Sequence, residues 1–222
     1  MTSGTNARFN FDFGLGDVKI LLRFHDSQTG GGKGRPSREL EVFKRAGVIL
    51  AVTAWETFIE DTLKDQFGAK LNAANSPKDV ESTFNSVAQA WLDRDKIKPP
   101  ELAQWALDGW KSMLMEKFSG DIEALNTPNS ANVRELFKRY LGEDITKAWC
   151  WQGVSANAAC GRLDALIKLR GGLVHRGREL FEEKASVQRH HVERAIVLLE
   201  RLVDRTETSL GIRPAVTSLG GS

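Results

Sequence analysis

Apolar residues recur at every third or fourth position along most of this chain. The pattern is clearest over residues 40–63 and 187–203. Such spacing places apolar side chains on one face of an α-helix, and that face is buried against neighbouring helices. We find no convincing strand run and no internal repeat in the same region. The sequence therefore predicts an all-α bundle.

Six helices are expected between the two ends of the chain, at residues 37–63, 76–91, 99–114, 132–141, 163–169 and 186–211. The first is the longest, and its section 47–52 is apolar on all sides, which predicts a central place in the bundle. Ser130 is expected to cap the fourth helix, Gly142 to end it, and Ser186 to cap the last one. The glycine pair 171–172 is expected to weaken or kink the fifth helix.

The two ends of the chain differ in composition from the helical region. Residues 30–36 are rich in glycine and end in a proline, and no regular element tolerates that composition. Phe9, Phe11 and Phe13 alternate with polar residues, which predicts a short extended segment or an N-terminal arm that docks on the core. We therefore divide the chain into an N-terminal arm and Gly-rich linker at 1–36, a helical domain at 37–212 and a flexible tail at 213–222.

Composition and charge exclude several classes of protein. The chain has 31 Lys and Arg residues against 29 Asp and Glu, so its formal charge is +2 and the surface as a whole does not favour nucleic acid. The longest apolar run, residues 46–54, is too short to cross a membrane. The N-terminus lacks a basic start followed by an apolar stretch. We therefore expect a cytoplasmic protein with no secretory signal and no membrane partner.

Familiar catalytic and metal-binding patterns are missing from the sequence. A Gly-Lys pair is followed by Gly34 rather than by the Ser or Thr of a phosphate-binding loop. Cys150 and Cys160 lie ten residues apart, which fits two free thiols better than a zinc site. His190 and His191 would point about 100° apart on a helix and cannot share an ion. We therefore expect no metal ion and no cofactor.

The densest polar cluster of the chain lies at residues 170–178. Arg170, Arg176 and Arg178 occur there with His175, one of only four histidines, and three glycines. Guanidinium groups bind phosphate oxygens through paired hydrogen bonds, and an imidazole transfers a proton near neutral pH. Cleavage of a phosphodiester without a metal requires these groups. The nucleophile would then be the ribose 2′-hydroxyl, which attacks its own phosphate, so the substrate would be RNA.

The spacing of Arg170 and His175 sets a geometric condition on that chemistry. Positions five apart on a regular helix point about 140° apart, so the two side chains converge only if the glycine pair distorts the helix. A structural role is the alternative, in which Arg170 pairs with Asp164 or Glu179 and His175 caps a backbone carbonyl. The residues alone leave both interpretations open.

Arg170 and His175 resemble the Arg-x(4 to 6)-His motif of the HEPN superfamily. Three segments in order resemble its RiboL-PSP branch, namely RAGVILAVTAWETFIE at 45–60, NVRELF at 132–137 and RGGLVHRG at 170–177. The resemblance covers residues 38–210, which is most of the chain. It implies an HEPN-type helical bundle with a long central helix and a kinked motif helix that carries Arg170 and His175.

The resemblance also implies an activity. Such domains form dimers whose two Arg-His motifs face each other across a cleft that binds RNA, and many are metal-independent endoribonucleases that act as toxins or in phage defence. Arg170 would hold the scissile phosphate, and His175 would transfer a proton or bind the phosphate. Arg176 and Arg178 lie outside the motif and are assigned to the RNA backbone on charge alone. We therefore predict a homodimer that cleaves RNA.

Two alternatives stay open at this point. Active members of the superfamily usually carry Asn, Asp or His directly after the motif arginine, and this chain has Gly171 there. A catalytically degenerate module would bind RNA or a nucleotide without cleaving it. A third possibility is a dimerising or partner-binding subunit, which docks an antitoxin or another protein of a defence complex.

Overall fold

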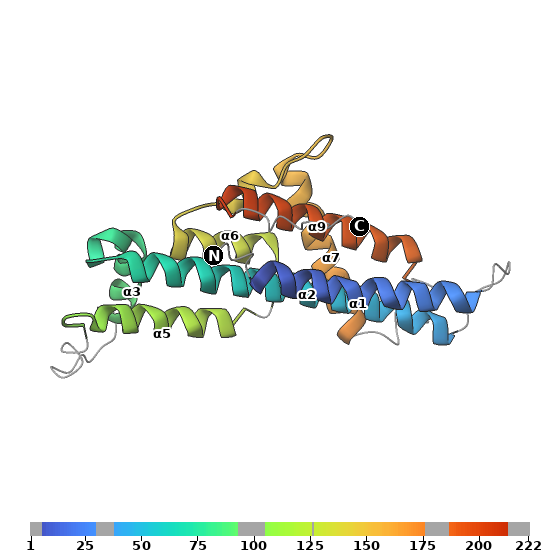
Figure 1. The fold of residues 1–222 in the computed structure, drawn as a ribbon, viewed down its shortest axis with the longest axis horizontal. Coiled ribbons are helices and arrows are strands. Elements are labelled where there is room, and N and C mark those ends of the chain that lie inside the picture. The colour runs from blue at the N-terminus through green and yellow to red at the C-terminus, as the bar shows by residue number, and fades with distance from the viewer. Residues whose placement is uncertain (1–5, 30–37, 93–104, 126, 176–186, 213–222) are drawn as a thin grey trace, which may run out of the picture. The chain divides into compact units, whose positions relative to one another are not determined.

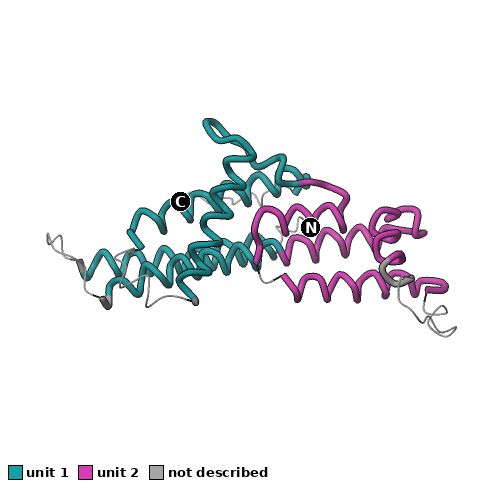
Figure 2. The backbone as a smooth tube through the Cα atoms, turned by 180° about the vertical axis from the view of Figure 1, so that it is seen from behind, with its two compact units in different colours: residues 1–59, 145–222 teal, residues 60–144 magenta. Residues whose placement is uncertain are grey.

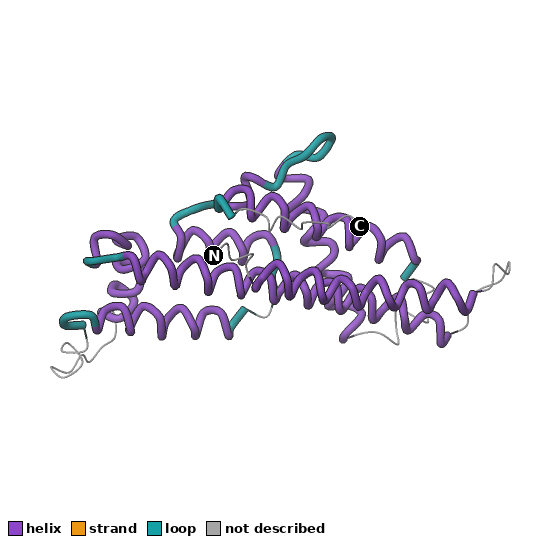
Figure 3. The backbone as a smooth tube through the Cα atoms, viewed as in Figure 1, coloured by secondary structure: helices purple, strands orange, loops and turns teal. Residues whose placement is uncertain are grey.

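The computed structural model describes residues 6–29, 38–92, 105–125, 127–175 and 187–212. The predicted all-α fold is confirmed, because seven α-helices and two short 3-10 helices make up the regular structure of these ranges. One isolated β-bridge joins Trp151 and Val154. Figures 1 and 3 show the helices and the loops that connect them.

The elements follow one another along the chain as α1 (Asn6–Thr29), α2 (Arg38–Ala73), η1 (Pro77–Val80), α3 (Glu81–Leu92), α5 (Gly109–Glu123), α6 (Ser130–Leu141), η2 (Ile145–Ala148), α7 (Ala156–His175) and α9 (Arg189–Ser209). The long helix predicted from residue 37 is confirmed as α2, which has 36 residues. The structure therefore has the long helix that the sequence placed in the bundle.

The chain forms two compact units (Figure 2). Unit 1 consists of Met1–Ile59 and Ile145–Ser222, and unit 2 consists of Glu60–Asp144. Helix α2 contributes its first part to unit 1 and its last part to unit 2. Helix α1 belongs to unit 1 together with α7 and α9, and the division at residues 36 and 212 that the sequence suggested stays a prediction.

For this segment the sequence left an extended conformation and a docking arm open, and the extended conformation is wrong because Phe9, Phe11 and Phe13 lie in helix α1. The three phenylalanines are two residues apart, but the buried positions of α1 are separated by three or four residues. These buried positions are Ala7, Phe11, Leu15, Val18 and Leu22. Burial of one helical face therefore decided the conformation, since isolated alternation over five residues is a weak signal.

The core of unit 1 is built around two buried tryptophans. Trp55 and Trp149 are fully buried and pack edge to face with ring centroids 5.7 Å apart. The indole N–H of Trp149 donates a hydrogen bond of 3.0 Å to the hydroxyl of Thr206 in α9. Phe58 stacks on Trp55 and meets Phe11 of α1 at 5.8 Å. This aromatic cluster joins α1, α2 and α9 to the turn that precedes α7.

The core of unit 2 contains an aromatic trio with a polar group at its edge. Phe67, Phe118 and Tyr140 lie with ring centroids 4.8–5.0 Å apart. The Tyr140 hydroxyl donates a hydrogen bond of 2.6 Å to Asp121. Burial, followed by this hydrogen bond, raises the pKa of Tyr140 above its ordinary value. Arg139 also donates to Asp121, at 2.7 Å.

Helix ends agree with the sequence at one position and differ at others. Gly142 ends α6 in the left-handed region, at φ 84°, as predicted. The cap of α6 is Asn129 rather than Ser130, because the Asn129 side chain accepts the backbone N–H of Asn132. The predicted cap of the last helix, Ser186, lies outside the described residues, and Gln188 is the N-cap of α9.

Candidate functional site

Helix α7 carries the motif arginine near its C-terminal end. The helix continues through the glycine pair at 171–172 and ends at His175. The sequence predicted that the glycine pair weakens or kinks this helix, but the helix does not end at the pair. A Cβ atom at Gly171 would meet nothing within 4 Å, so packing inside the chain does not demand a glycine at this position. Arg170 and Gly171 are both half-buried.

Arg170 has a buried hydrogen-bond donor that no described residue uses. Its Nε is buried and has no hydrogen-bond partner within the described part of the chain. The structural alternative paired Arg170 with Asp164 or Glu179. The Nε of Arg170 forms no hydrogen bond to Asp164, and Glu179 lies outside the described residues. A buried N–H that forms no hydrogen bond is destabilising by roughly 1–3 kcal/mol, so such groups call for an explanation.

The other residues of the predicted site lie at the end of α7 or after it. His175 is the last residue of α7, and the description of this residue stops at its backbone. Arg176 and Arg178 lie outside the described residues. The convergence of these groups with Arg170 therefore stays a prediction.

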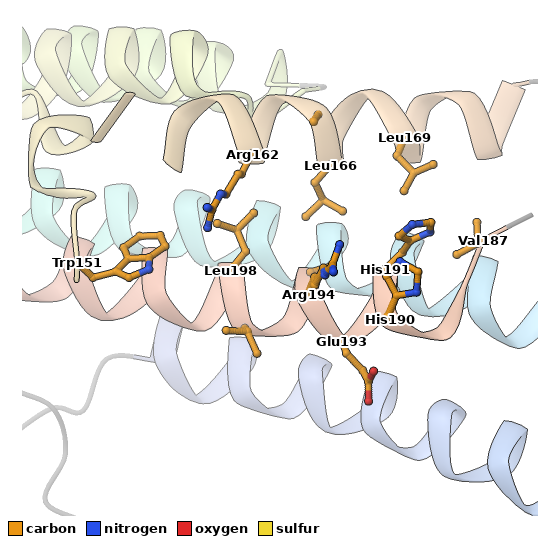
Figure 4. A pocket seen from close by; sticks show the side chains of 13 residues that line it. Trp151, Arg162, Leu166, Leu169, Val187, His190, His191, Glu193, Arg194 and Leu198 are labelled. Atoms are coloured by element: carbon orange, nitrogen blue, oxygen red, sulfur yellow. The ribbon is translucent and has the colours of Figure 1, made fainter. Parts of the chain in front are cut away.

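A groove of about 960 Å³ runs between α7 and α9 next to the motif (Figure 4). Leu166 and Leu169 line it from α7, and Leu198 lines it from α9. Leu169 directly precedes Arg170 in the chain. Trp151 lies at one end of the groove, and Val187, which precedes α9, lies at the other end. The floor of this groove is mainly apolar.

Two arginines from opposite walls enter the groove. Arg162 projects from α7 and Arg194 from α9, and both side chains lie in the space between the two helices in Figure 4. Neither forms an ion pair with a carboxylate that the structure describes. Glu193 also lines the groove, but it pairs with Arg189, which pairs in turn with Asp26. The groove therefore combines an apolar floor with two available guanidinium groups.

His190 and His191 occupy the first turn of α9 at the end of the groove (Figure 4). The backbone N–H of Gln188 donates to Nδ1 of His191 at 3.1 Å, so this imidazole caps the helix. Burial, followed by the charges of His190, Arg194 and Lys44, lowers the pKa of His191. The neutral imidazole is the form that accepts this hydrogen bond, so the same environment favours the cap.

A buried ion pair fixes the start of α9. Glu41 and Lys44 are both buried, and their charged groups lie 2.9 Å apart. The backbone N–H of Val187 donates to the other carboxylate oxygen of Glu41 at 2.8 Å. Arg45 Nε lies 3.8 Å from the same oxygen. Helix α2 therefore fixes Val187, the residue at which the chain enters the groove after the motif segment.

The described residues also bear on metal binding and on membrane insertion. In the described ranges, no group of three or more His, Cys, Asp or Glu side chains is placed to hold a metal ion. None of the described helices combines the length and the apolar character that spanning a membrane requires. Cys150 is exposed and Cys160 is buried, and both are free thiols.

Sequence reasoning missed Arg162 and Arg194 as site residues. They are 32 positions apart, and each looks like an ordinary charged position on an amphipathic helix. Their only shared signal is that both precede an apolar residue of the buried face, which holds for many surface arginines. The pairing of α7 with α9 brings them to one groove.

The fold and the motif helix define an HEPN superfamily domain. A sequence profile of the RiboL-PSP-HEPN family matches residues 16–211, and the chain therefore belongs to that family. No curated protein and no solved structure matches the chain. Membership indicates a ribonuclease-like or RNA-binding role.

Proposed function

We propose that this protein is a metal-independent endoribonuclease. The 2′-hydroxyl of a ribose attacks the adjacent phosphate, the 5′-oxygen leaves, and a 2′,3′-cyclic phosphate remains. Arg170 binds the phosphate and stabilises the charge that develops on it. His175 moves a proton, either from the attacking hydroxyl or to the leaving oxygen. The protein acts in the cytoplasm as a toxin or as an effector against phage.

The observation that carries this proposal is the Nε of Arg170, which has no hydrogen-bond partner among the described residues. A guanidinium held half-buried with an unused donor is already desolvated, which strengthens its hydrogen bonds to an incoming phosphate. Its place on α7, five residues before the histidine at the helix end, matches the motif of the family to which the chain belongs.

The helical geometry favours a site built from two copies. On a regular helix Arg170 and His175 point about 140° apart, and α7 is continuous between them. One motif therefore does not bring both groups to one side of a phosphate. Two motifs that face each other across a twofold axis supply an arginine and a histidine from different chains, so we propose a homodimer.

The RNA backbone is bound on either side of the motif. Arg176 and Arg178 are assigned to phosphates that flank the cleavage site, as their charge suggests. Arg162 and Arg194 extend this surface into the groove, and Trp151 offers a ring on which a base can stack. A nuclease of this kind has to be silenced in its own cell, so we also propose a protein partner that covers the motif.

A specific residue favours a second candidate function. Gly171 supplies no side chain where active members usually carry a polar one, and its Cβ position is open. A domain that binds RNA through Arg170 without cleaving it would fit this residue. Gly171→Asn separates the two functions, because it adds an amide without steric conflict and raises cleavage if the missing polar group limits the reaction.

The test incubates purified protein with total tRNA and a mixed RNA pool in EDTA. Cleavage with 2′,3′-cyclic phosphate ends is expected, with a loss of about 100-fold or more in His175→Ala and Arg170→Ala. Lys168→Ala is the matched control, because Lys168 is an exposed cation on the same helix. An RNA with a 2′-deoxy substitution at the cleaved position should resist the enzyme. Salt-sensitive RNA binding without cleavage would favour the second function, and neither binding nor cleavage would refute both.

A further inference from the structure

The outer face of α1 carries a row of exposed apolar side chains. Phe9, Phe13, Ile20 and Phe24 have exposed fractions of 71%, 67%, 40% and 57%. At 100° per residue these four positions fall within an arc of about 60°, and they span about 22 Å of helix. We call these four residues the α1 stripe. It lies nearly opposite the buried face of α1, so this helix is apolar on two sides.

The α1 stripe exposes an apolar area of the size of a typical protein's largest patch, and such patches are often functional. The rings of Phe9 and Phe13 stack on each other with centroids 6.5 Å apart. Together the four side chains expose on the order of 450 Å² of apolar surface, since a large aromatic side chain covers about 200 Å². Contiguous apolar patches of this size mark interaction sites more often than isolated exposed residues do.

The α1 stripe has a palindromic arrangement. Phe9 and Phe24 are equally distant in sequence from the point between Gly16 and Asp17, and so are Phe13 and Ile20. If two such helices lie antiparallel across a twofold axis at this point, each residue of the stripe meets the residue of the second copy that is equally distant from the axis on the other side in sequence. Phe9 then meets Phe24 of the second copy, and Phe13 meets Ile20 of that copy. Contacts of this self-complementary kind are typical of twofold dimers.

Gly16 supplies an independent observation at the centre of the stripe. A Cβ atom at Gly16 would meet nothing within 4 Å, so packing within the chain does not require a glycine there. By contrast, a Cβ at Gly14 would lie 2.9 Å from the Cβ of Ala54, so Gly14 allows α1 to approach α2. A glycine inside a helix is destabilising relative to alanine. The open position at Gly16 leaves room for a second backbone to approach the centre of the stripe.

We propose that the α1 stripe binds the α1 stripe of a second copy of this chain, antiparallel and across a twofold axis between Gly16 and Asp17. Two stripes bring together about 900 Å² of apolar surface, close to the roughly 1,000 Å² that a stable interface needs before the flanking residues are counted. The palindrome selects a second copy over an unrelated protein, because an unrelated partner would place no symmetry requirement on the stripe.

This contact is distinct from the dimer proposed for RNA cleavage, which is formed through the motif of α7. A chain with two different twofold contacts assembles into tetramers or longer arrays rather than stopping at a dimer. Disruption of the α1 stripe therefore reduces the assembly without removing the motif pair. The experiments below measure association and not cleavage, so failure of either proposal is recognised separately.

Disulfide trapping tests the antiparallel register. In a Cys150→Ser background, Asp17→Cys is expected to cross-link to itself under mild oxidation, because the two equivalent positions flank the axis. Phe9→Cys is expected not to cross-link to itself, because the two positions would be about 22 Å apart, but to form a mixed dimer with Phe24→Cys. Self-cross-linking of Phe9→Cys without the mixed product would overturn the antiparallel arrangement.

Light scattering tests the contact itself. Phe13→Glu and Ile20→Glu are each expected to weaken association through α1 by about 100-fold or more, because two unpaired carboxylates enter the interface of each pair. Val42→Glu is the matched control, since Val42 is an exposed apolar residue of α2 outside the stripe. Equal masses for wild type and both stripe variants would overturn the proposal. If the wild-type protein stays monomeric and binds phosphatidylglycerol vesicles, the stripe would instead be assigned to a membrane surface.

Discussion

The buried ion pair between Glu41 and Lys44 allows a quantitative test of how the groove is held. Lys44→Met removes the ammonium and keeps the side-chain length, which leaves the Glu41 carboxylate buried with the Val187 N–H as its close donor. Glu41→Gln removes the negative charge and keeps an oxygen for Val187. The double variant Glu41→Gln/Lys44→Met removes both charges and still satisfies that backbone N–H.

The magnitudes follow from burial. Both side chains are less than a tenth exposed, so neither charge is well solvated when its partner is removed. Loss of one partner of a buried pair is destabilising by about 3–5 kcal/mol, and Arg45 near Glu41 places Lys44→Met at the lower end, about 3 kcal/mol. The double variant should lie within about 1 kcal/mol of wild type, because paired removal of buried charges is nearly neutral.

The assay is unfolding in guanidinium chloride, followed by tryptophan fluorescence and circular dichroism for all four proteins. Trp55 and Trp149 report on unit 1, in which the ion pair lies. A double variant that is destabilised by the sum of the two single changes would refute the reasoning, because the two residues would then act independently. RNA cleavage by the single variants should fall further than their folded fraction, since Val187 fixes the chain just after the motif segment.

Three further predictions concern stability. Burial raises the pKa of Asp121, but hydrogen bonds from Lys117, Tyr140 and Arg139 together outweigh it, so the pKa is lowered. The stabilisation is therefore present above the ordinary carboxyl pKa and is lost as the pH falls through the lowered value. The free energy of unfolding, measured for wild type and Asp121→Asn between about pH 5 and pH 2, should depend less on pH in the variant. Gly142→Ala should lower the free energy of unfolding by about 1 kcal/mol, because alanine is strained at φ 84°. Urea unfolding measures this change, and an unchanged stability would contradict the left-handed cap. Trp149→Phe should lower the free energy of unfolding by about 3 kcal/mol, and adding Thr206→Val should recover part of this loss by removing the hydroxyl that is left without its donor. Additive effects in the double variant would argue against that hydrogen bond.

The positions of most helices could be predicted from the sequence, because helical periodicity is a local property. Helix α2 and helix α6 with its Gly142 end were anticipated in this way. The start of α5 was not, since this helix begins at Gly109 after a turn in which Leu107 has φ 53°. The cap at Asn129 was missed by one residue because Asn and Ser are both good caps and only the hydrogen-bond geometry separates them.

Helix α1 shows why a short pattern misleads. Residues four apart share a face in a helix, and residues two and four apart share a face in a strand. Phe9 and Phe13 therefore fit either structure, and the position of Phe11 distinguishes the helix from the strand. In the helix Phe11 turns inward to meet Phe58, while Phe9 and Phe13 form the outer stripe. The choice depended on a neighbour 47 positions away, which no local pattern contains.

By itself the sequence determined that the chain is helical and where the Arg-His motif lies, because helix formation and motif spacing involve residues close together in the chain. The tertiary structure decided which groups stand beside that motif. It placed Val187 on Glu41 across 146 positions and brought Arg162 and Arg194 into one groove. Such contacts depend on which apolar faces are buried together, and many pairings of amphipathic helices satisfy the same periodicity. Burial of specific side chains selects among these pairings, so the groove and its charges emerge only with the fold.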